Sequence, residues 1–160
     1  MIPLIISLIG YSAFESGRIF PHALSYINPL GGGYESGYKN LSDSNHDWGQ
    51  GIPELQQWKE KHSIDNMAHW YFGTDPRTLM IGSESINPLD WPIHNVNDFR
   101  DRMNGRYLAV CTTILYGSYV SKPEGLMVIE YLRTSPIYDR TSTFVIYDFT
   151  QPVAEKVAAK

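Results

Sequence analysis

The sequence predicts an α/β fold, a single-domain sandwich in which helices cover a mostly parallel sheet of about four strands. Predicted strands and helices alternate along the chain, and this order favours such a sheet. The 160 residues are enough to bury a core, and a content of 42% hydrophobic and 19% charged residues is typical of a folded protein. We therefore expect one α/β domain over residues 18–160, preceded by an apolar segment over residues 1–17.

The first 14 residues are nearly all apolar and carry no charged side chain. They are fewer than the roughly 20 residues that span a bilayer. The basic n-region and the small-residue cleavage site of a signal peptide are not evident. Two interpretations stay open: a core-facing segment of the fold, or the outer end of a transmembrane helix. Residues 15–30 then mix aromatic groups with a lone arginine, as at a membrane interface or in a surface turn.

The elements up to residue 106 follow from hydrophobic spacing and from residues that break regular structure. Residues 38–41 are expected to form a short strand. Residues 52–62 are expected to form a helix, because their apolar side chains recur on one side and a proline suits the first turn. Residues 64–72 lead into a strand that Gly and Asp-Pro terminate. Residues 77–106 show little periodicity and are interpreted as a short helix with irregular loops.

The last third of the chain contains the clearest strand patterns. Residues 107–116 are β-branched and apolar and are bounded by glycines, which predicts a strand. Residues 125–133 place apolar side chains at helical spacing. Residues 141–149 predict the last strand, and residues 153–160 are expected to fray or to form a short helix.

The densest group of polar side chains is residues 43–50, which we call the polar octet; it holds two acids, two amides, a histidine and a tryptophan. Buried carboxylates and amides need partners, so the octet is expected to be a loop leading into a helix and not a core strand. Ligands of α/β sheets gather at the carboxyl ends of strands, where the octet and the end of the 64–72 strand are expected to lie. The candidate ligand-binding residues are Asp43, Asn45, Asp47, Trp48, Gln50, Tyr71 and Asp75. The alternative is that these side chains only cap a helix and pin the loop to Tyr71 and Asp75.

The sequence predicts no catalytic residue, metal ligand or cofactor. Four octet and helix residues fall at positions 1, 3, 5 and 12 of a calcium-loop template, namely Asp43, Asn45, Asp47 and Glu54. The template fails where Trp48 replaces its required glycine. Zinc is disfavoured because the histidines show no short paired spacing and the single cysteine, Cys111, lies in an apolar strand pattern. The net charge of −4 argues against a nucleic-acid partner.

Residues 20–28, 31–32 and 37–50, followed by residues 71–76, 107–110 and 144–148, resemble in the same order the C-terminal region of a membrane-protein family. That family is the bacterial polytopic glycosyltransferases related to dolichyl-phosphate-mannose–protein mannosyltransferases. The resemblance covers most of residues 18–149, and the Asp-Ser-Asn-x-Asp-Trp-Gly-Gln string of the octet is its most specific part.

The resemblance implies an extracytoplasmic, membrane-associated domain on the periplasmic face, next to a membrane domain that is not part of this sequence. Because the family places its catalytic acid in that membrane domain, this chain is expected to be inactive alone. It is expected to position an acceptor or a lipid-linked glycan for an enzyme that uses a polyprenyl-phosphate sugar. Its expected partners are the membrane domain of a glycosyltransferase and a glycan or lipid-linked sugar. The alternative is a free-standing α/β hydrolase or a divalent-metal-binding domain that uses Asp43 and Asp47.

Overall fold

A five-stranded sheet forms the centre of the computed structural model, which describes residues 2–20, 25–40, 42 and 46–151. Its strands lie in the order β2-β1-β3-β5-β4. Their bounds are β1 Met67–Trp70, β2 Glu84–Ser85, β3 Tyr107–Cys111, β4 Asp139–Arg140 and β5 Phe144–Asp148. Strand β1 is parallel to both β2 and β3, whereas β5 is antiparallel to both β3 and β4. The predicted α/β class is confirmed, and the sheet is mixed because its last two strands are joined as a hairpin.

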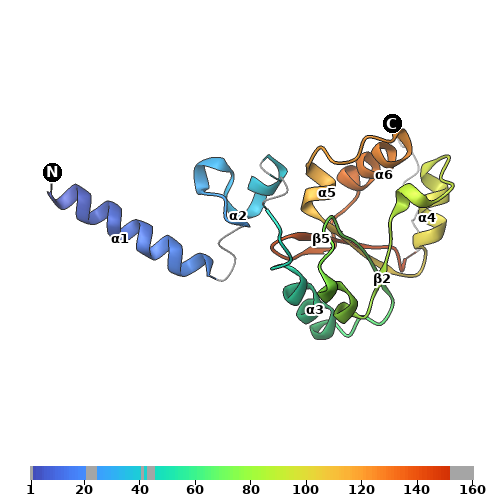
Figure 1. Cartoon of the computed structure of the whole chain (residues 1–160), viewed down its shortest axis with the longest axis horizontal. Coiled ribbons are helices and arrows are strands. Elements are labelled where there is room, and N and C mark those ends of the chain that lie inside the picture. The colour runs from blue at the N-terminus through green and yellow to red at the C-terminus, as the bar shows by residue number, and fades with distance from the viewer. Residues whose placement is uncertain (1, 21–24, 41, 43–45, 152–160) are drawn as a thin grey trace.

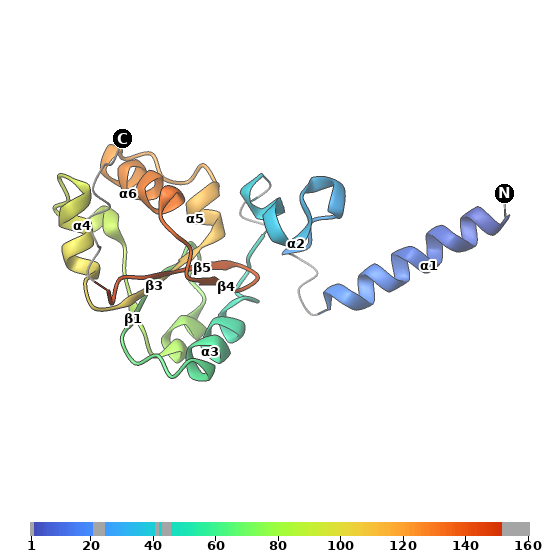
Figure 2. The same cartoon turned by 180° about the vertical axis from the view of Figure 1, so that it is seen from behind.

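Helices cover both faces of the sheet (Figures 1 and 2). On one face, α3 (Ile52–Lys61) and the 3-10 helix η4 (Pro76–Ile81) pack on side chains such as Phe144 and Ile146. On the other face lie α4 (Val96–Met103), α5 (Thr112–Tyr116) and α6 (Pro123–Thr134), which bury Val110 and Val145. The two faces therefore carry separate hydrophobic cores, as a layered sandwich requires.

Local sequence accounts for the helices that were predicted. Helix α3 has a proline in its first turn and buries Leu55 and Trp58 against the sheet, while two lysines in its last turn complement the helix dipole. Helix α4 begins with a capping box: the side chain of Asn95 accepts a hydrogen bond from the backbone amide of Asp98, and the side chain of Asp98 accepts one from the backbone amide of Asn95. Helix α6 covers the predicted 125–133 segment and extends it at both ends.

Three short elements differ from the sequence-based expectation. The strand expected at residues 38–41 is wrong, because Gly37–Lys39 form a 3-10 helix, η3. Two other short helices precede it, η2 (Pro29–Gly31) and α2 (Gly33–Ser36). Tyr38 is buried with its ring 5.3 Å from that of Tyr116. A contact to α5, distant in sequence, thus determines the conformation of this segment.

The strand expected at residues 107–116 stops at Cys111, and the remaining residues form α5. Its partner β5 begins at Phe144 opposite Cys111, and the amide of Thr112 makes one further bond to the carbonyl of Thr143 at 2.8 Å. Without a partner strand beyond that point, the β-branched residues turn into a helix that buries Ile114 and Leu115. Strands β2 and β4 were not predicted, since two residues carry no readable periodicity. Residues 153–160 lie outside the described residues.

Helix α1 (Ile2–Ile19) projects away from the sheet (Figures 1 and 2). The interpretation of residues 1–14 as a core-facing segment is wrong, because Ile2, Leu4, Ile6, Leu8 and Phe14 are all exposed. No helix among the described residues combines the length and the apolarity needed to cross a membrane.

Candidate functional site

The part of the polar octet that the structure describes, residues 46–50, lies at the carboxyl ends of β1 and β3. Asp47 contacts Cys111, the last residue of β3. Gly49 lies so close to the side chains of Asp75 and Arg77 that a Cβ atom at this position would clash with both. The octet is therefore packed against the loop that leaves β1. Asp43 and Asn45, also candidates, lie outside the described residues.

Asp47 is directed into the protein and is only 5% exposed. Its Oδ1 accepts a hydrogen bond from the amide of Gly49 at 2.8 Å, and its Oδ2 lies 3.9 Å from the Cys111 thiol that donates to it. Burial raises the pKa of Asp47, while the backbone amides of Gly49 and Gly51 act in the opposite direction. This buried carboxylate therefore holds the loop in place from inside.

Cys111 is fully buried, as the sequence predicts. Burial, with the neighbouring Asp47 carboxylate, raises the pKa of the thiol to about 12. At neutral pH the sulfur is thus protonated and is not a nucleophile. Beside it, His46 is also buried, with its Nδ1 at 3.3 Å from the hydroxyl of Thr112 at the start of α5.

Among the described octet residues, 46–50, Trp48 has the side chain that faces solvent, with 67% of its surface exposed. Gln50 fixes the backbone on either side of it: its Oε1 accepts from the Trp48 amide at 2.7 Å, and its Nε2 donates to the His46 carbonyl at 2.8 Å. Gln50 is thus used within the loop, and the indole of Trp48 is held outward on a fixed turn.

Tyr71 and Asp75 follow β1 and complete this edge of the sheet. Tyr71 is half-buried with its ring 5.8 Å from that of Phe144, and burial together with the nearby acids raises the pKa of its phenol. Asp75 caps η4 by accepting from the Arg77 amide at 2.9 Å, and it forms a 2.6 Å ion pair with the Arg77 guanidinium. Those contacts with Arg77 lower the pKa of Asp75.

The calcium-template residues that the structure describes point in different directions. Glu54, the twelfth position, accepts from the amide and the hydroxyl of Ser142 in the β4–β5 turn. Asp47 is turned toward Gly49 and Cys111. Within the described parts of the chain, no three His, Cys, Asp or Glu side chains are grouped so as to hold a metal ion.

A cleft of about 510 Å³ lies beside this loop, at the carboxyl ends of β1 and β2. Its aromatic walls are Phe72, Trp91 and Tyr119, and the rings of Phe72 and Tyr119 are 4.3 Å apart. Its polar lining includes Asn87 and Asp90, which are fixed by a 2.9 Å bond from the Asn87 amide to Asp90 Oδ2. We call this feature the β1–β2 cleft.

The β1–β2 cleft forms because the chain leaves the two strands toward opposite faces of the sheet. After β1 it runs to η4, which packs beside α3. After β2 it runs to η5 (Pro88–Asp90), which packs beside α6 on the other face. A crevice at such a point, outside the carboxyl ends of parallel strands, is where α/β sheets bind ligands.

Of the seven candidate residues, five are described and all five lie at this edge of the sheet, but only Tyr71 lines the β1–β2 cleft. The sequence-based reasoning missed the other cleft residues. One signal was available: residues 87–91, Asn-Pro-Leu-Asp-Trp, are a second short run that combines an amide, an acid and a tryptophan. They lie in the 77–106 segment interpreted as irregular loop.

Comparisons of the chain with protein-family models, with curated proteins and with solved structures find no match.

Proposed function

We propose that this chain is an extracytoplasmic, non-catalytic accessory domain of a membrane glycosyltransferase that uses a polyprenyl-phosphate sugar. In this proposal the domain positions an acceptor or a lipid-linked glycan. The observation that carries it is the β1–β2 cleft, a crevice of about 510 Å³ at the strand ends that combines aromatic rings with an amide and a carboxylate.

The lining of the cleft suits a carbohydrate. Sugar rings present apolar faces that stack on aromatic side chains, here Phe72 and Tyr119, while their hydroxyls need hydrogen-bonding partners. Asn87 and Asp90 supply such partners in the same lining and are already ordered by their mutual bond. The exposed indole of Trp48 stands on the neighbouring loop and offers a further stacking surface at the same edge.

The membrane placement is supported by α1. This helix carries apolar side chains around its circumference from Ile2 to Phe14, and water surrounds them in the isolated chain. A helix that is apolar on all sides is stable when lipid or other helices cover it. The sheet then lies beside the membrane, joined to it through α1.

In this proposal the domain binds the glycan and the partner membrane domain catalyses the transfer, because the carboxylates of Asp47 and Asp75 are already used in contacts within the protein. Asp47 supports the loop from inside, and Asp75 is paired with Arg77. Neither carboxylate is placed to act on a ligand in the cleft.

A saccharide titration tests the proposal. Methyl α-mannopyranoside, methyl β-glucopyranoside and N-acetylglucosamine would each be added to the chain, followed by ligand-observed NMR and by intrinsic tryptophan fluorescence, to which Trp70 and Trp91 in the cleft contribute. We expect at least one sugar to bind, and Tyr119→Ala to weaken it about tenfold, the loss typical of one aromatic contact.

The matched control is Tyr138→Ala. Tyr138 is 49% exposed against 43% for Tyr119, and it also packs on another ring, that of Tyr107 at 5.2 Å, but it lies outside the cleft. Equal binding by the two variants, or no response to any of the three sugars, would contradict a glycan site in the cleft. Thermal shifts with Ca²⁺ and Mg²⁺ test the alternative: a large shift that Asp47→Asn abolishes would favour a metal-dependent enzyme.

A further inference from the structure

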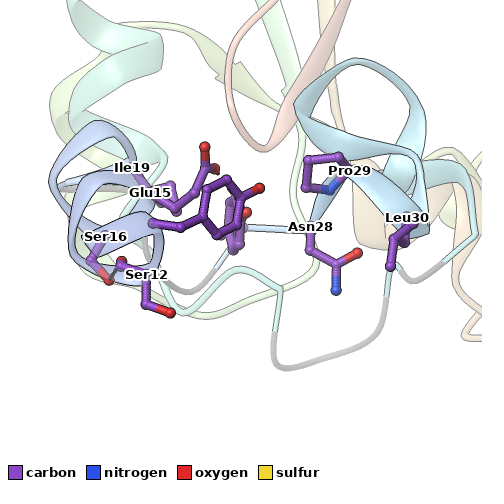
Figure 3. A pocket seen from close by; sticks show the side chains of 9 residues that line it. Ser12, Glu15, Ser16, Ile19, Asn28, Pro29 and Leu30 are labelled. Carbon is purple, nitrogen blue, oxygen red and sulfur yellow. Dashed lines mark hydrogen bonds between the residues drawn. The ribbon is translucent and has the colours of Figure 1, made fainter. Parts of the chain in front are cut away.

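A second pocket, of about 680 Å³, lies at the domain end of α1, far from the β1–β2 cleft in the fold. In Figure 3, Ser12, Glu15 and Ser16 of α1 form one wall, and Asn28, Pro29 and Leu30 form the wall opposite. We call it the Glu15 pocket. Its two walls come from the apolar helix and from the short helices that precede the octet.

Helix α1 carries two charged side chains, Glu15 and Arg18; Glu15 lines the pocket, and Arg18 lies beside Glu15 one turn further along the helix. Glu15 is 8% exposed, and its Oε2 accepts a hydrogen bond from the Tyr26 hydroxyl at 3.0 Å. Its Oε1 is 3.9 Å from the guanidinium of Arg18, which is longer than a hydrogen bond. The Arg18 side chain is largely exposed. A sheltered carboxylate and an exposed guanidinium thus stand side by side at one end of an apolar helix.

The surroundings of this charge pair are aromatic and apolar. The rings of Tyr11 and Tyr26 line the pocket with Glu15, and carboxylates and tyrosine rings both attract cations. Leu30 also lines the pocket and is completely exposed, and Phe14 and Phe20, near Glu15 in the sequence, are exposed as well. A ligand that matches this surface carries a cation, an anion next to it, and an apolar body.

Glu15 and Arg18 lie at the end of the uncharged part of α1, so the apolar part of a ligand could lie along residues 2–14. Residues 2–14 carry no charge and at 1.5 Å per residue extend about 20 Å. The hydroxyl of Ser7 donates to the Pro3 carbonyl at 2.9 Å, so that polar group is satisfied within the helix. Such a segment suits hydrocarbon, and Glu15 and Arg18 then lie at the level of the lipid headgroups.

We propose that the Glu15 pocket binds the headgroup of a zwitterionic phospholipid. The ammonium group lies against Glu15 and the tyrosine rings, the phosphate pairs with Arg18, and residues 2–14 lie among the acyl chains. The proposal rests on the membrane placement in the proposed function, and it does not depend on the β1–β2 cleft.

Flotation of the full chain with lipid vesicles tests this site. Vesicles of phosphatidylcholine and of phosphatidylglycerol would carry the same acyl chains, so that they differ in the headgroup. We expect Glu15→Gln to weaken binding to phosphatidylcholine about tenfold, the effect of losing one charged contact, and to leave binding to phosphatidylglycerol unchanged. Arg18→Gln is expected to weaken binding to both lipids, because both contain the phosphate.

The matched control is Glu130→Gln on α6. Glu130 and Arg133 form the same i,i+3 pair as Glu15 and Arg18, also at 3.9 Å, but they lie on α6 and do not line the Glu15 pocket. This variant makes the same change in net charge and is expected to bind both vesicles like the unaltered chain. Circular dichroism of Glu15→Gln and Glu130→Gln checks that helix content is unchanged.

Several results of the flotation experiment would overturn the headgroup site. One is equal binding of Glu15→Gln and the unaltered chain to phosphatidylcholine, and another is stronger binding of Glu15→Gln to both lipids, as a general charge effect would give. If all variants float equally well with both lipids, the headgroup site is contradicted but the membrane placement is still supported. If the unaltered chain floats with neither vesicle, both the headgroup site and the membrane placement are contradicted. The saccharide titration of the cleft is unaffected by any of these results.

Discussion

The side chain of Asp47 offers the sharpest test of how the octet loop is held. Asp47→Ala removes the acceptor for the Gly49 amide and the partner of Cys111 in a site that is closed to water. A buried donor left without a partner costs roughly 1–3 kcal/mol. The amides of Gly49 and Gly51 both act on this carboxylate, so we expect a loss of about 2–5 kcal/mol. At about 3 °C per kcal/mol, the midpoint of thermal unfolding falls by roughly 6–15 °C.

Asp47→Asn separates the hydrogen bonds from the charge. The amide oxygen still accepts from Gly49, so we expect a loss of at most about 1 kcal/mol at neutral pH. The pH dependence of the folding stability shows whether the charge on Asp47 stabilises or destabilises the folded chain. Burial raises the folded-state pKa of Asp47 above the ordinary value of 3.8, so the folded chain binds this proton more tightly than the unfolded chain does. The resulting stability is complete below pH 3.8 and is lost as the pH rises through the raised folded-state pKa.

Urea unfolding from pH 3.5 to pH 8, followed by tryptophan fluorescence and circular dichroism, measures both effects. The stability of Asp47→Asn relative to the unaltered chain is expected to improve as the pH rises, because the variant has no buried charge to create. A loss below about 0.5 kcal/mol in Asp47→Ala is the effect of an ordinary surface residue, and it would refute the internal role of this carboxylate. A difference between Asp47→Asn and the unaltered chain that does not vary with pH would refute the electrostatic part.

Three further predictions concern residues near the same edge of the sheet. Gly51→Ala is expected to destabilise the chain by about 1–3 kcal/mol, because its Cβ would overlap the Thr143 hydroxyl, whereas Gly17→Ala in open space on α1 is expected to be neutral or slightly stabilising in the same unfolding assay, since alanine is the better helix former. Trp48→Ala is expected to change stability by less than about 0.5 kcal/mol, since the indole is exposed; a larger loss would show that it packs on the protein. Burial lowers the pKa of His69, so its contribution to stability is complete above pH 6.5 and is lost as the pH falls through the folded-state value. His69→Asn keeps a polar atom for the Ser83 hydroxyl, 2.8 Å from Nδ1, and is expected to flatten the loss of stability between pH 6.5 and pH 5; an unchanged slope would contradict this.

The elements that could be predicted from the sequence are those whose local pattern and tertiary role agree. In α3, a proline in the first turn, apolar side chains on one side and lysines in the last turn are all consistent with the buried face that the structure shows. The strand predicted at residues 141–149 likewise contains β5 (Phe144–Asp148), which is buried on both faces, while residues 141–143 form the turn before it. In both cases each local preference points to the same result.

The errors arise where a distant partner overrides the local preference. Thr112 and Thr113 favour a strand, yet they begin a helix because β5 offers no partner beyond Thr143. The expected strand at residues 38–41 fails for a similar reason, because Tyr38 packs against Tyr116 of α5. Strands of two residues, such as β2, exist only through their neighbours and leave no periodic signal.

The candidate site divides in the same way. By itself the sequence determined the α/β class, the burial of Cys111 and the polar octet next to α3, because composition, hydrophobic spacing and helix-start signals are local properties. Only the tertiary structure decided that Asp47 turns inward while Trp48 turns outward, since that choice depends on the end of β3 and the exit of β1 meeting at one edge. It also decided that residues 72, 87–91 and 119 close around one cleft. The directions in which the chain leaves β1 and β2 set that arrangement, and no local pattern encodes them.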